Sequence, residues 1–148
     1  MQLLRKLATF NIPEEDMKHI YIWYIRSLLE HLCVVWHSML TSDNKNDLER
    51  LQKSAFKIIL KEKYKNYQNA LNRLQLVTLE ERREQLILSF AKKCITNDKM
   101  KSLFPLNKKN HIMNTRCQEK YFVNHAKTSR LQNSPIIYMQ KKLNDEAN

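Results

Sequence analysis

The sequence predicts an all-α protein, a small helical bundle of about four helices followed by a loop-rich basic tail and a short terminal helix. Apolar residues recur at spacings of three and four through the first two thirds of the chain, as in amphipathic helices. Helix-start signals stand before several of these segments. After Asn97 the periodicity is lost, and polar clusters surround Pro105. The sequence therefore divides into a helical domain, residues 1–97, and a less regular basic extension, residues 98–148.

The first predicted helix begins after Pro13 and continues to Leu40. Proline is favoured in the first turn, and the acids at 14–16 suit the positive end of the helix dipole. At 1.5 Å per residue such a helix is about 40 Å long. Two apolar stripes follow it, one of Met17, Tyr21, Tyr24, Leu28, Leu32, Val35 and Met39 and the other of Ile25, Leu29, Cys33, Trp36 and Leu40. Because the stripes converge at the C-terminal end, we expect Trp36 to be a core anchor and His37 to lie at the boundary with solvent.

Three further helices are predicted before residue 98. Thr41 and Ser42 provide a cap for a second helix that ends near Lys61, "KYKNYQNALNRL" forms a short third, and Thr78 with Glu81 makes a capping box for a fourth. The expected core positions are Leu48, Leu51, Ala55, Phe56, Ile58 and Ile59 in the second helix and Leu79, Leu86, Phe90 and Ala91 in the fourth. Near the C-terminus, an extended piece up to Pro135 should precede the short terminal helix.

Composition restricts the classes of function. The chain has no glycine, which excludes a glycine-rich phosphate loop or a nucleophile elbow. Its three cysteines have no CxxC spacing, so no disulfide framework is indicated and a reducing compartment fits best. The longest uncharged run is far shorter than the roughly 20 residues of a membrane helix, and no signal-peptide pattern opens the chain. We therefore expect a soluble intracellular protein, nuclear or cytoplasmic.

Catalytic and metal-binding patterns are weak. No Asp-Asp pair is available to hold two metal ions, and the acidic groups at 14–16 and at Glu80, Glu81 and Glu84 are explained by helix N-terminal electrostatics. Cys33 and His37 share a helix face but give only two ligands, and His111, Cys117 and His125 match no zinc spacing. Cys33 is interpreted as a small buried hydrophobe. We expect no catalytic residues, no metal and no cofactor.

The charge pattern instead favours a polyanionic partner. The formal net charge is +11, and the excess of basic residues lies after residue 41. Basic residues interleaved with aromatics suit phosphate contacts and base stacking. The candidate nucleic-acid-binding residues are Lys61, Lys63, Tyr64, Lys65, Tyr67, Arg82, Arg83, Lys108, Lys109, Arg116, Lys127 and Arg130. A solvated connector with core tyrosines, complementation of the helix dipole and simple solubility of the tail remain open as alternative explanations.

The order of several segments is more informative than composition. The segments are "YIRSLLEHLCVVWHSML", "LERLQKSAFKIIL", "YKNYQNALNRLQLVTLEERREQLILSFAKKC", "LFP" and "TSRLQNSPIIYMQKKLN". Together they resemble the C-terminal region of reverse transcriptases from jockey-like non-LTR retrotransposons, over nearly the whole chain. The family commonly has Tyr at the position of His31 and Pro at that of Val34 or Val35. We therefore expect the first helix to continue here where relatives bend. Ile137 likewise replaces a usual second Pro.

The resemblance implies a helical thumb and a short C-terminal extension that grip the backbone of a primer-template. The palm with its paired aspartates, the fingers and the endonuclease have no counterpart in this sequence, so the resemblance implies a truncated or domesticated element fragment that is not an enzyme. The leading hypothesis is a non-catalytic remnant that binds RNA, DNA or hybrid backbone. The alternatives are a protein-interaction module that uses the former palm-facing helix surface, and a relic without a cellular role.

Overall fold

The computed structural model describes residues 1–107 and 120–147, and within these residues the protein is all-α. The prediction of the fold class is therefore confirmed. The helices do not form one bundle of about four, because the chain folds into two compact units. The first unit comprises Met1–Leu32 and Leu40–Arg83, and the second comprises Cys33–Met39 and Glu84–Asn148. This division falls at other residues than the predicted boundary at residue 97.

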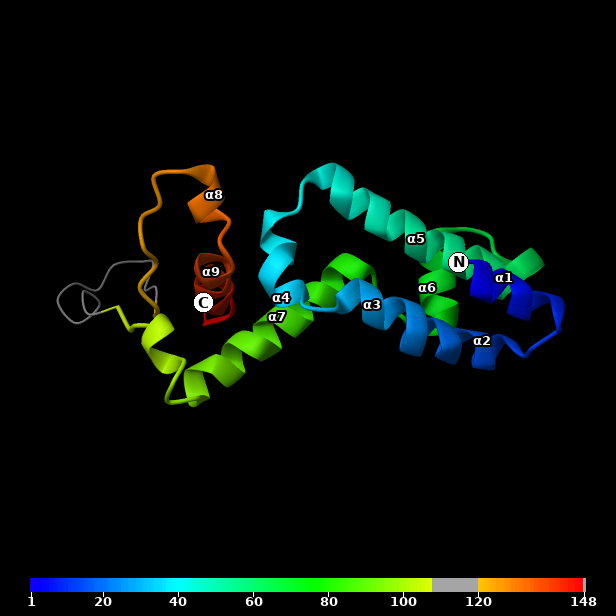
Figure 1. Ribbon diagram of the computed structural model, residues 1–148, viewed down its shortest axis with the longest axis horizontal. Helices are drawn as coiled ribbons and strands as arrows, with labels where there is room; N and C mark the ends of the chain where they lie inside the picture. Colours follow the sequence, from blue (N-terminus) through cyan, green and yellow to red (C-terminus); the bar gives the residue numbers. More distant parts are fainter. Residues whose placement is uncertain (108–119, 148) are drawn as a thin grey trace. The chain divides into compact units, whose positions relative to one another are not determined.

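The first unit is built around α5, Ser42–Leu60, which contacts α1, Gln2–Thr9, α2, Glu14–Ile20, and α6, Tyr67–Leu74 (Figure 1). The remaining elements of this unit are the π-helical turn η1 Tyr21–Arg26, α3 Ser27–Glu30, the 3-10 turn η3 Lys61–Lys63 and the first residues of α7 Leu79–Thr96. Side chains from α1, α2, η1, α5 and α6 share one core: Leu4, Met17, Tyr21, Ala55, Phe56, Ile59, Leu60, Ala70, Leu71 and Leu74.

The second unit combines the greater part of α7 with segments from two distant regions of the sequence. They are α4 Cys33–Trp36, the 3-10 turns η2 His37–Met39 and η4 Lys101–Leu103, α8 Ser129–Gln132 and α9 Pro135–Ala147. Helix α9 contacts α4, η2 and α8, and an isolated antiparallel bridge joins Leu106 to Tyr121. The buried core contains Ile87, Ala91, Cys94, Phe104, Tyr121, Met139 and Leu143.

Most predicted helix starts are confirmed. Pro13 stands at the N-cap of α2, and Thr41 Oγ1 accepts from the Asn44 amide of α5 at 3.3 Å. Thr78 Oγ1 accepts from the Glu81 amide at 3.2 Å, as the capping box requires on that side. The predicted terminal helix is α9. Two helices were not predicted: α1, which buries Leu4, and α8, which replaces part of the extended piece before Pro135.

The prediction of one continuous helix from Pro13 to Leu40 is wrong. Regular α-helix stops at Ile20, a π-helical turn follows, and α3 ends at Glu30. His31 has ψ 125° and Leu32 has φ 50°, so the chain leaves the helical conformation there. A positive φ in leucine is unfavourable, because its Cβ crowds the backbone. The segment therefore bends before Val34, although it lacks the proline that the resembled family has nearby.

The π-helical turn changes which residues face the core. Its i→i+5 hydrogen bonds admit an extra residue into the turn, so the later side chains are displaced by one position. Met17 and Tyr21 are buried as predicted, but Tyr24 and Leu28 are exposed, and Ile25 packs against the core in their place. The first predicted stripe is thus wrong beyond Tyr21. The second stripe is correct for Ile25 and for the buried Cys33.

In α5 and α7 a polar side chain is buried while a residue predicted for the core is exposed. In α5 Leu51 is exposed while the neighbouring Gln52 is fully buried, and in α7 Phe90 is exposed while Arg83 is fully buried. The predicted core positions Ala55, Phe56, Ile59, Leu79 and Ala91 are confirmed. The spacing of apolar residues cannot predict that an amide or a guanidinium is buried. Such a group is buried only where hydrogen bonds or ion pairs compensate its loss of water, and these depend on the fold.

Four non-glycine residues have positive φ in the described part of the chain: Asn11, Leu32, Lys61 and Gln75, at 49° to 53°. Gln75 ends α6 in the left-handed conformation that glycine usually provides at this position. Lys61 ends α5 at φ 49° and ψ −123°, a region that glycine enters most easily. Because the chain has no glycine, residues with a Cβ atom adopt these unfavourable backbone conformations at the ends of α5 and α6.

None of the helices in the described residues has the length and continuous apolar character that crossing a membrane requires.

The structure reverses the expected burial of Trp36 and His37. His37 is almost completely buried in the second unit, where its ring meets Tyr138 edge-on at a centroid distance of 6.0 Å, whereas Trp36 is half-buried. We therefore predict that His37→Ala destabilises the protein by about 1–3 kcal/mol, because it removes a buried ring contact and leaves a void. His125→Ala, at an exposed position of the same unit, should change stability by less than about 0.5 kcal/mol. Urea unfolding measures both, and equal effects would contradict the assignment.

Candidate nucleic-acid interface

A chain of buried hydrogen bonds centred on Gln52 connects four segments of the first unit. The Tyr21 hydroxyl donates to Gln52 Oε1 at 2.6 Å. The Gln52 amide nitrogen donates to the Tyr67 hydroxyl at 2.9 Å and to the Val77 carbonyl at 3.0 Å. One amide on α5 thereby fixes the positions of η1, α6 and the connection that leads to α7, since all of its partners must keep hydrogen-bond geometry.

The same chain continues to Glu49, one turn earlier in α5. The Tyr67 hydroxyl donates to one carboxylate oxygen of Glu49, and the backbone N–H of Glu80 donates to the other at 2.9 Å. Burial is the main cause that raises the pKa of Tyr21 and of Tyr67 well above the usual tyrosine range, and the bond to Glu49 raises that of Tyr67 further. Both tyrosines therefore stay protonated and serve as hydrogen-bond donors.

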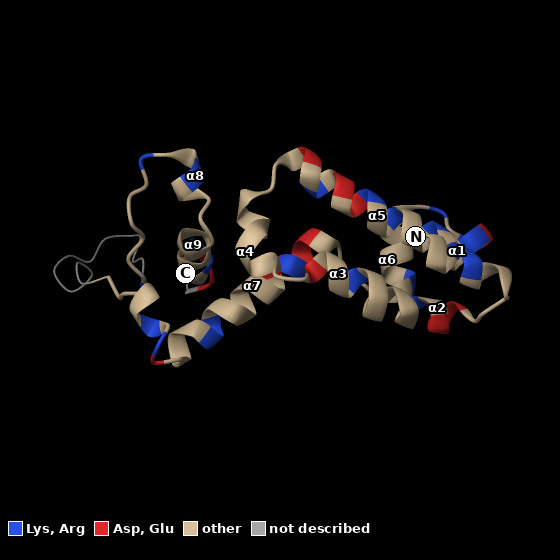
Figure 2. Cartoon of the chain, viewed as in Figure 1, with Lys and Arg blue, Asp and Glu red and all other residues tan. Residues whose placement is uncertain are grey.

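A row of lysines lies on α5 beside this network. Lys53 and Lys57 stand four residues apart in α5, so their Cα atoms are about 6 Å apart along one side of the helix, and Lys61 follows at the same spacing as the first residue after the helix. The acids of α5 precede this row, and the basic residues continue to the end of the helix (Figure 2). Lys53 Nζ lies 5.0 Å from the Tyr67 ring centroid, and Lys57 Nζ lies 5.7 Å from that of Tyr64. The rings hold the ammonium groups close to the helix surface.

The row is extended by η3, which follows α5. Lys61 Nζ donates to the Ala8 carbonyl at 3.0 Å, and Lys63 Nζ lies 3.2 Å from a Glu14 carboxylate oxygen. Lys65 is exposed just beyond this turn. We call Lys53, Lys57, Lys61, Lys63, Tyr64 and Lys65 the lysine row. It offers several ammonium groups to an anionic backbone, with a half-buried tyrosine ring among them.

Glu14 is the acidic neighbour of this row. Besides Lys63, its carboxylate binds Arg73 Nε at 2.9 Å. The hydrogen bond from Arg73 is the largest effect on Glu14 and, together with the bond from Lys63, lowers the pKa of that carboxyl below its ordinary value, against a smaller opposing effect of burial. A shallow pocket of about 300 Å³ lies here, lined by Ile12, Glu14, Ile59, Leu60, Lys61, Glu62 and Lys63.

The fold turns the side chains of two predicted nucleic-acid contacts inward, wholly or in part. Arg83 is fully buried in the first unit. Tyr67 is half-buried, stacks on Phe56 at 5.9 Å and directs its hydroxyl to Glu49. The guanidinium is thus closed off from solvent, and the tyrosine hydroxyl is already hydrogen-bonded within the unit. Arg82 Nε lies 3.5 Å from a Glu30 carboxylate oxygen, so this predicted contact is already engaged in an ion pair.

The remaining predicted residues belong to the C-terminal part of the chain. Lys127 and Arg130 are exposed in the second unit, before and within α8. Lys108, Lys109 and Arg116 lie outside the described residues. The structure therefore brings together the predicted residues Lys61, Lys63, Tyr64 and Lys65 within the first unit.

Sequence reasoning missed Lys53 and Lys57 as members of the lysine row. Their four-residue spacing with Lys61 was visible in the sequence and could have indicated the row. The proximity to Tyr64 and Tyr67 was not visible, because it depends on how η3 and α6 fold back along α5.

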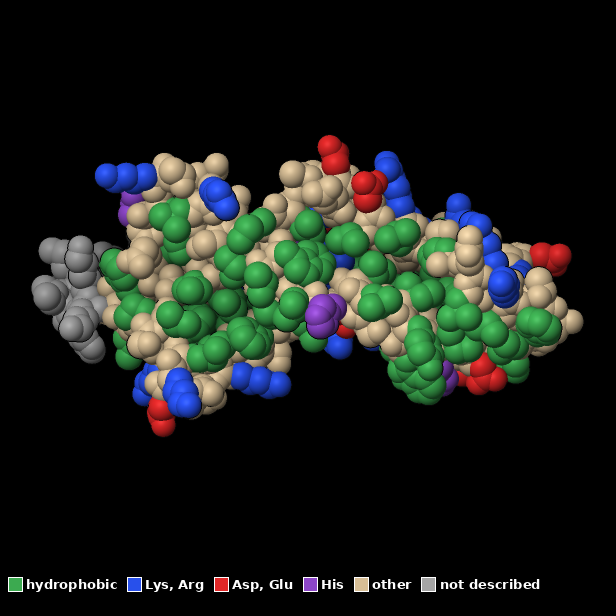
Figure 3. Space-filling view, in the orientation of Figure 1, with side chains coloured by type: hydrophobic (Ala, Val, Ile, Leu, Met, Phe, Trp, Pro, Cys, Tyr) green, Lys and Arg blue, Asp and Glu red, His purple; other side chains and the backbone are tan. Residues whose placement is uncertain are grey.

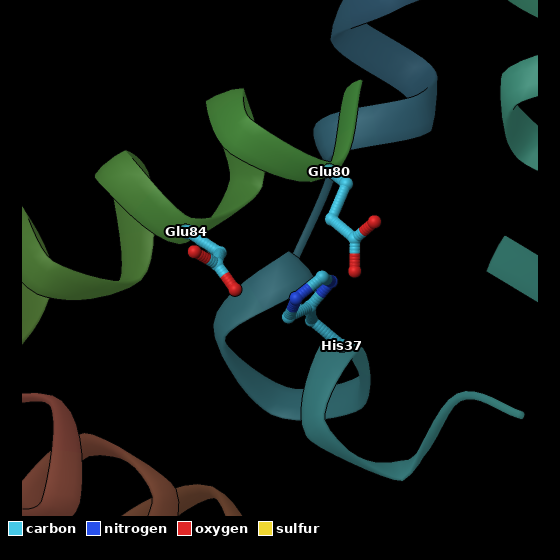
Figure 4. Close-up of side chains that lie close together, drawn as sticks. All are labelled: His37, Glu80 and Glu84. Atoms are coloured by element: carbon cyan, nitrogen blue, oxygen red, sulfur yellow. The ribbon is translucent and has the colours of Figure 1, made fainter. Parts of the chain in front are cut away.

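The second unit contains a polar cluster around Glu84. Its carboxylate accepts from the Tyr138 hydroxyl and from Lys142 Nζ, both at 3.2 Å, and one of its oxygens lies within 4.8 Å of a His37 ring nitrogen (Figure 4). Glu80, drawn in the same figure, belongs to the first unit, where Lys45 Nζ lies 2.7 Å from its carboxylate. His37 and Glu84 alone provide fewer ligands than zinc sites use. Of the other sequence candidates, Cys33 is buried, His125 is exposed, and His111 and Cys117 lie outside the described residues.

Comparison with known proteins assigns no relative. No protein-family model matches the chain, and no curated protein or solved structure does so either.

The ion pairs of Glu14 should make stability depend on pH. Because its folded-state pKa is lowered, its contribution is fully present above the ordinary carboxyl pKa of 4.5 and is lost as the pH falls through the lowered value. Glu14→Gln should therefore lower stability at neutral pH by up to about 1 kcal/mol, with a smaller difference in acid. Asp16→Asn, in the same exposed first turn, is the control. Thermal melts across pH measure both variants, and a constant Glu14→Gln difference would contradict this account.

Proposed function

We propose that the protein binds the sugar-phosphate backbone of nucleic acid through the lysine row. The observation that carries this proposal is the pair Lys53 and Lys57 on one side of α5, continued by Lys61, Lys63 and Lys65 in and just after η3. Ammonium groups in a row can follow successive phosphates, and each contact releases counterions from the nucleic acid. The formal charge of +11 adds long-range attraction.

Backbone recognition is favoured over base recognition by the types of side chain present. Lysine ammonium groups contact phosphates as point charges on flexible stems, and the lysine row contains no Arg, Asn or Gln, whose planar groups read base edges. The half-buried Tyr64 offers a ring edge or face for sequence-tolerant stacking. The proposed partner is therefore RNA, DNA or a hybrid, bound without strong sequence preference.

We further propose an origin for this interface. The resemblance to jockey-like non-LTR reverse transcriptases assigns the chain to a thumb-like region and its C-terminal extension, and an all-α fold with a basic surface is compatible with that assignment. In this proposal the chain is a non-catalytic, thumb-like remnant of an RNA-directed DNA polymerase, which retains the grip on the backbone. The order of the five resembling segments supports it. Binding by the lysine row is a separate proposal that can hold without this ancestry.

A second function, protein interaction, is favoured by a different observation. The segment from η1 to α3 exposes large apolar side chains to solvent, among them Trp23 and Leu28. Exposed clusters of this kind commonly mark interaction sites. The two functions use different surfaces of the first unit and do not exclude each other.

We predict that the double variant Lys53→Ala/Lys57→Ala lowers affinity for single-stranded RNA and DNA at least tenfold, uniformly across sequences. The slope of log affinity against log salt should become shallower by about one to two units, because up to two phosphate contacts are lost. Fluorescence anisotropy at several salt concentrations measures both quantities. Lys99→Ala/Lys101→Ala, which removes the same charge from the second unit, is the matched control. Equal losses in both variants, or binding that does not respond to salt, would contradict the proposed interface.

A further inference from the structure

In the segment from Tyr21 to Leu32, large apolar side chains face solvent and the charged side chains do not. Four large side chains are turned outward, with exposed fractions of 66% for Trp23, 62% for Tyr24, 76% for Leu28 and 59% for Leu32. We call these four residues the apolar face. Figure 3 shows hydrophobic side chains gathered at the surface over α2 and α3. A solvent-facing helix surface normally carries charged residues, so this face has the composition of a buried one.

The charged residues of the same segment are turned inward. Arg26 and Glu30 are the segment's only charged residues, and their side chains are 15% and 14% exposed. Arg26 Nε lies 3.1 Å from Glu30 Oε1, and Arg82 Nε lies 3.5 Å from the same oxygen. The outward surface between Tyr21 and Leu32 consequently carries no exposed Asp, Glu, Lys or Arg, and His31 is the histidine at its end. The ion pair with Arg82 also holds the segment in this orientation, because a rotation that buried Leu28 would separate Glu30 from Arg82.

We propose that a second copy of this chain covers the apolar face, so that the protein is a symmetric dimer in which the two faces pack against each other. This proposal rests on the protein-interaction function above and names its partner. Tyr24 and Leu28 stand four residues apart and form a short ridge along the helix surface. Two identical ridges of this spacing can interdigitate, as a two-fold axis requires of a self-complementary surface.

The size of the face agrees with what a dimer needs. With aromatic side chains of about 150–250 Å² each and somewhat smaller leucines, the exposed parts of the four residues sum to roughly 500 Å². Two copies would then bury roughly 1,000 Å², which is the lower limit for a specific interface. A partner that contributed no apolar surface of similar extent would leave part of the face exposed to water.

The charge distribution also favours a second copy over an acidic partner. An acidic protein would be attracted to Lys and Arg, and the outward surface between Tyr21 and Leu32 carries neither. Two chains of formal charge +11 repel each other, but they can meet through an uncharged surface once salt screens the remaining charges. The dimer should therefore become tighter as salt increases. Binding of nucleic acid should become weaker under the same change, so the two proposals are tested separately.

Sedimentation velocity of the full chain tests the dimer. In the absence of nucleic acid, the wild-type protein should sediment as a concentration-dependent dimer at up to about 100 µM, and added salt should raise the dimer fraction. Leu28→Glu should shift the protein to monomer and raise the dissociation constant at least tenfold, because two carboxylates would be buried in the interface. Leu28→Met, which keeps the apolar surface, should retain the dimer. Leu3→Glu, at another exposed leucine of the first unit, is the matched control and should also remain dimeric.

Tyr24→Glu provides a second disruption of the face, at another exposed position, and it should give a monomer with unchanged helix content by circular dichroism. A wild-type protein that stays monomeric at the highest concentration overturns the proposal. Recruitment of that monomer to anionic lipid vesicles would identify a lipid surface as the occupant and would likewise overturn it. Equal weakening by Leu28→Glu and Leu3→Glu would place the interface elsewhere. None of these results bears on nucleic-acid binding, which is measured with the lysine variants.

Discussion

The hydrogen bonds of Gln52 are the constraint on which the rest of the first unit depends. A primary amide in a core must satisfy both its oxygen and its nitrogen, or the unpaired group costs about 1–3 kcal/mol. Gln52 does so with Tyr21, Tyr67 and Val77, which belong to three separate segments. Apolar contacts alone would tolerate small shifts of these segments against α5. Directional bonds do not, so the network specifies one arrangement of the unit.

This arrangement determines what reaches the surface of α5. Tyr67 is held by Gln52 and Glu49, and its ring lies beside Lys53. The sharp end of α5 at Lys61 then brings Tyr64 to Lys57. The positions of the lysines thus follow from the buried polar network and from the turn after the helix. The proposed backbone-binding surface therefore depends on the buried hydrogen bonds of Gln52 and Glu49.

The π-helical turn η1 determines which apolar side chains are exposed. The extra residue in η1 turns Ile25 toward the core and leaves Tyr24 and Leu28 outside, while Arg26 and Glu30 pair within the unit. A regular α-helix of the same sequence would place the apolar stripe inward. The exposure of this face is therefore a property of the fold, and the dimer proposal gives it a physical explanation.

The sequence was sufficient to predict the parts of the fold that depend on local rules. The starts of α2, α5 and α7 follow from proline and caps, which act over a few residues, whereas α6 begins at Tyr67, later than the predicted segment from Lys63. The failures concern side chains whose position depends on distant partners. Gln52, Arg83 and His37 are buried where an apolar pattern predicts Leu51, Phe90 and Trp36, because polar groups can replace apolar ones once the fold supplies partners.

The candidate site was predictable to a similar extent. The cluster of basic and aromatic residues at 61–65 was recognised from composition, and the structure adds Lys53 and Lys57 to it. Tyr67 and Arg83 were also predicted as contacts, because an exposed and a buried position look alike in a helical repeat that mixes polar and apolar residues. Only the contacts with Phe56 and Glu49 show that Tyr67 serves the core.

The most direct test of the central claim is the free energy of unfolding of Gln52→Leu, measured with urea. Leucine has a similar volume and is more apolar, so a core held by hydrophobic packing alone would keep or increase its stability. The polar network predicts the opposite, a loss of about 2–4 kcal/mol, because the Tyr21 hydroxyl loses its acceptor and the Val77 carbonyl loses its donor, while Tyr67 keeps only its bond to Glu49. Gln68→Leu, at an exposed position of α6, should have little effect. A Gln52→Leu protein as stable as the wild type would contradict this account.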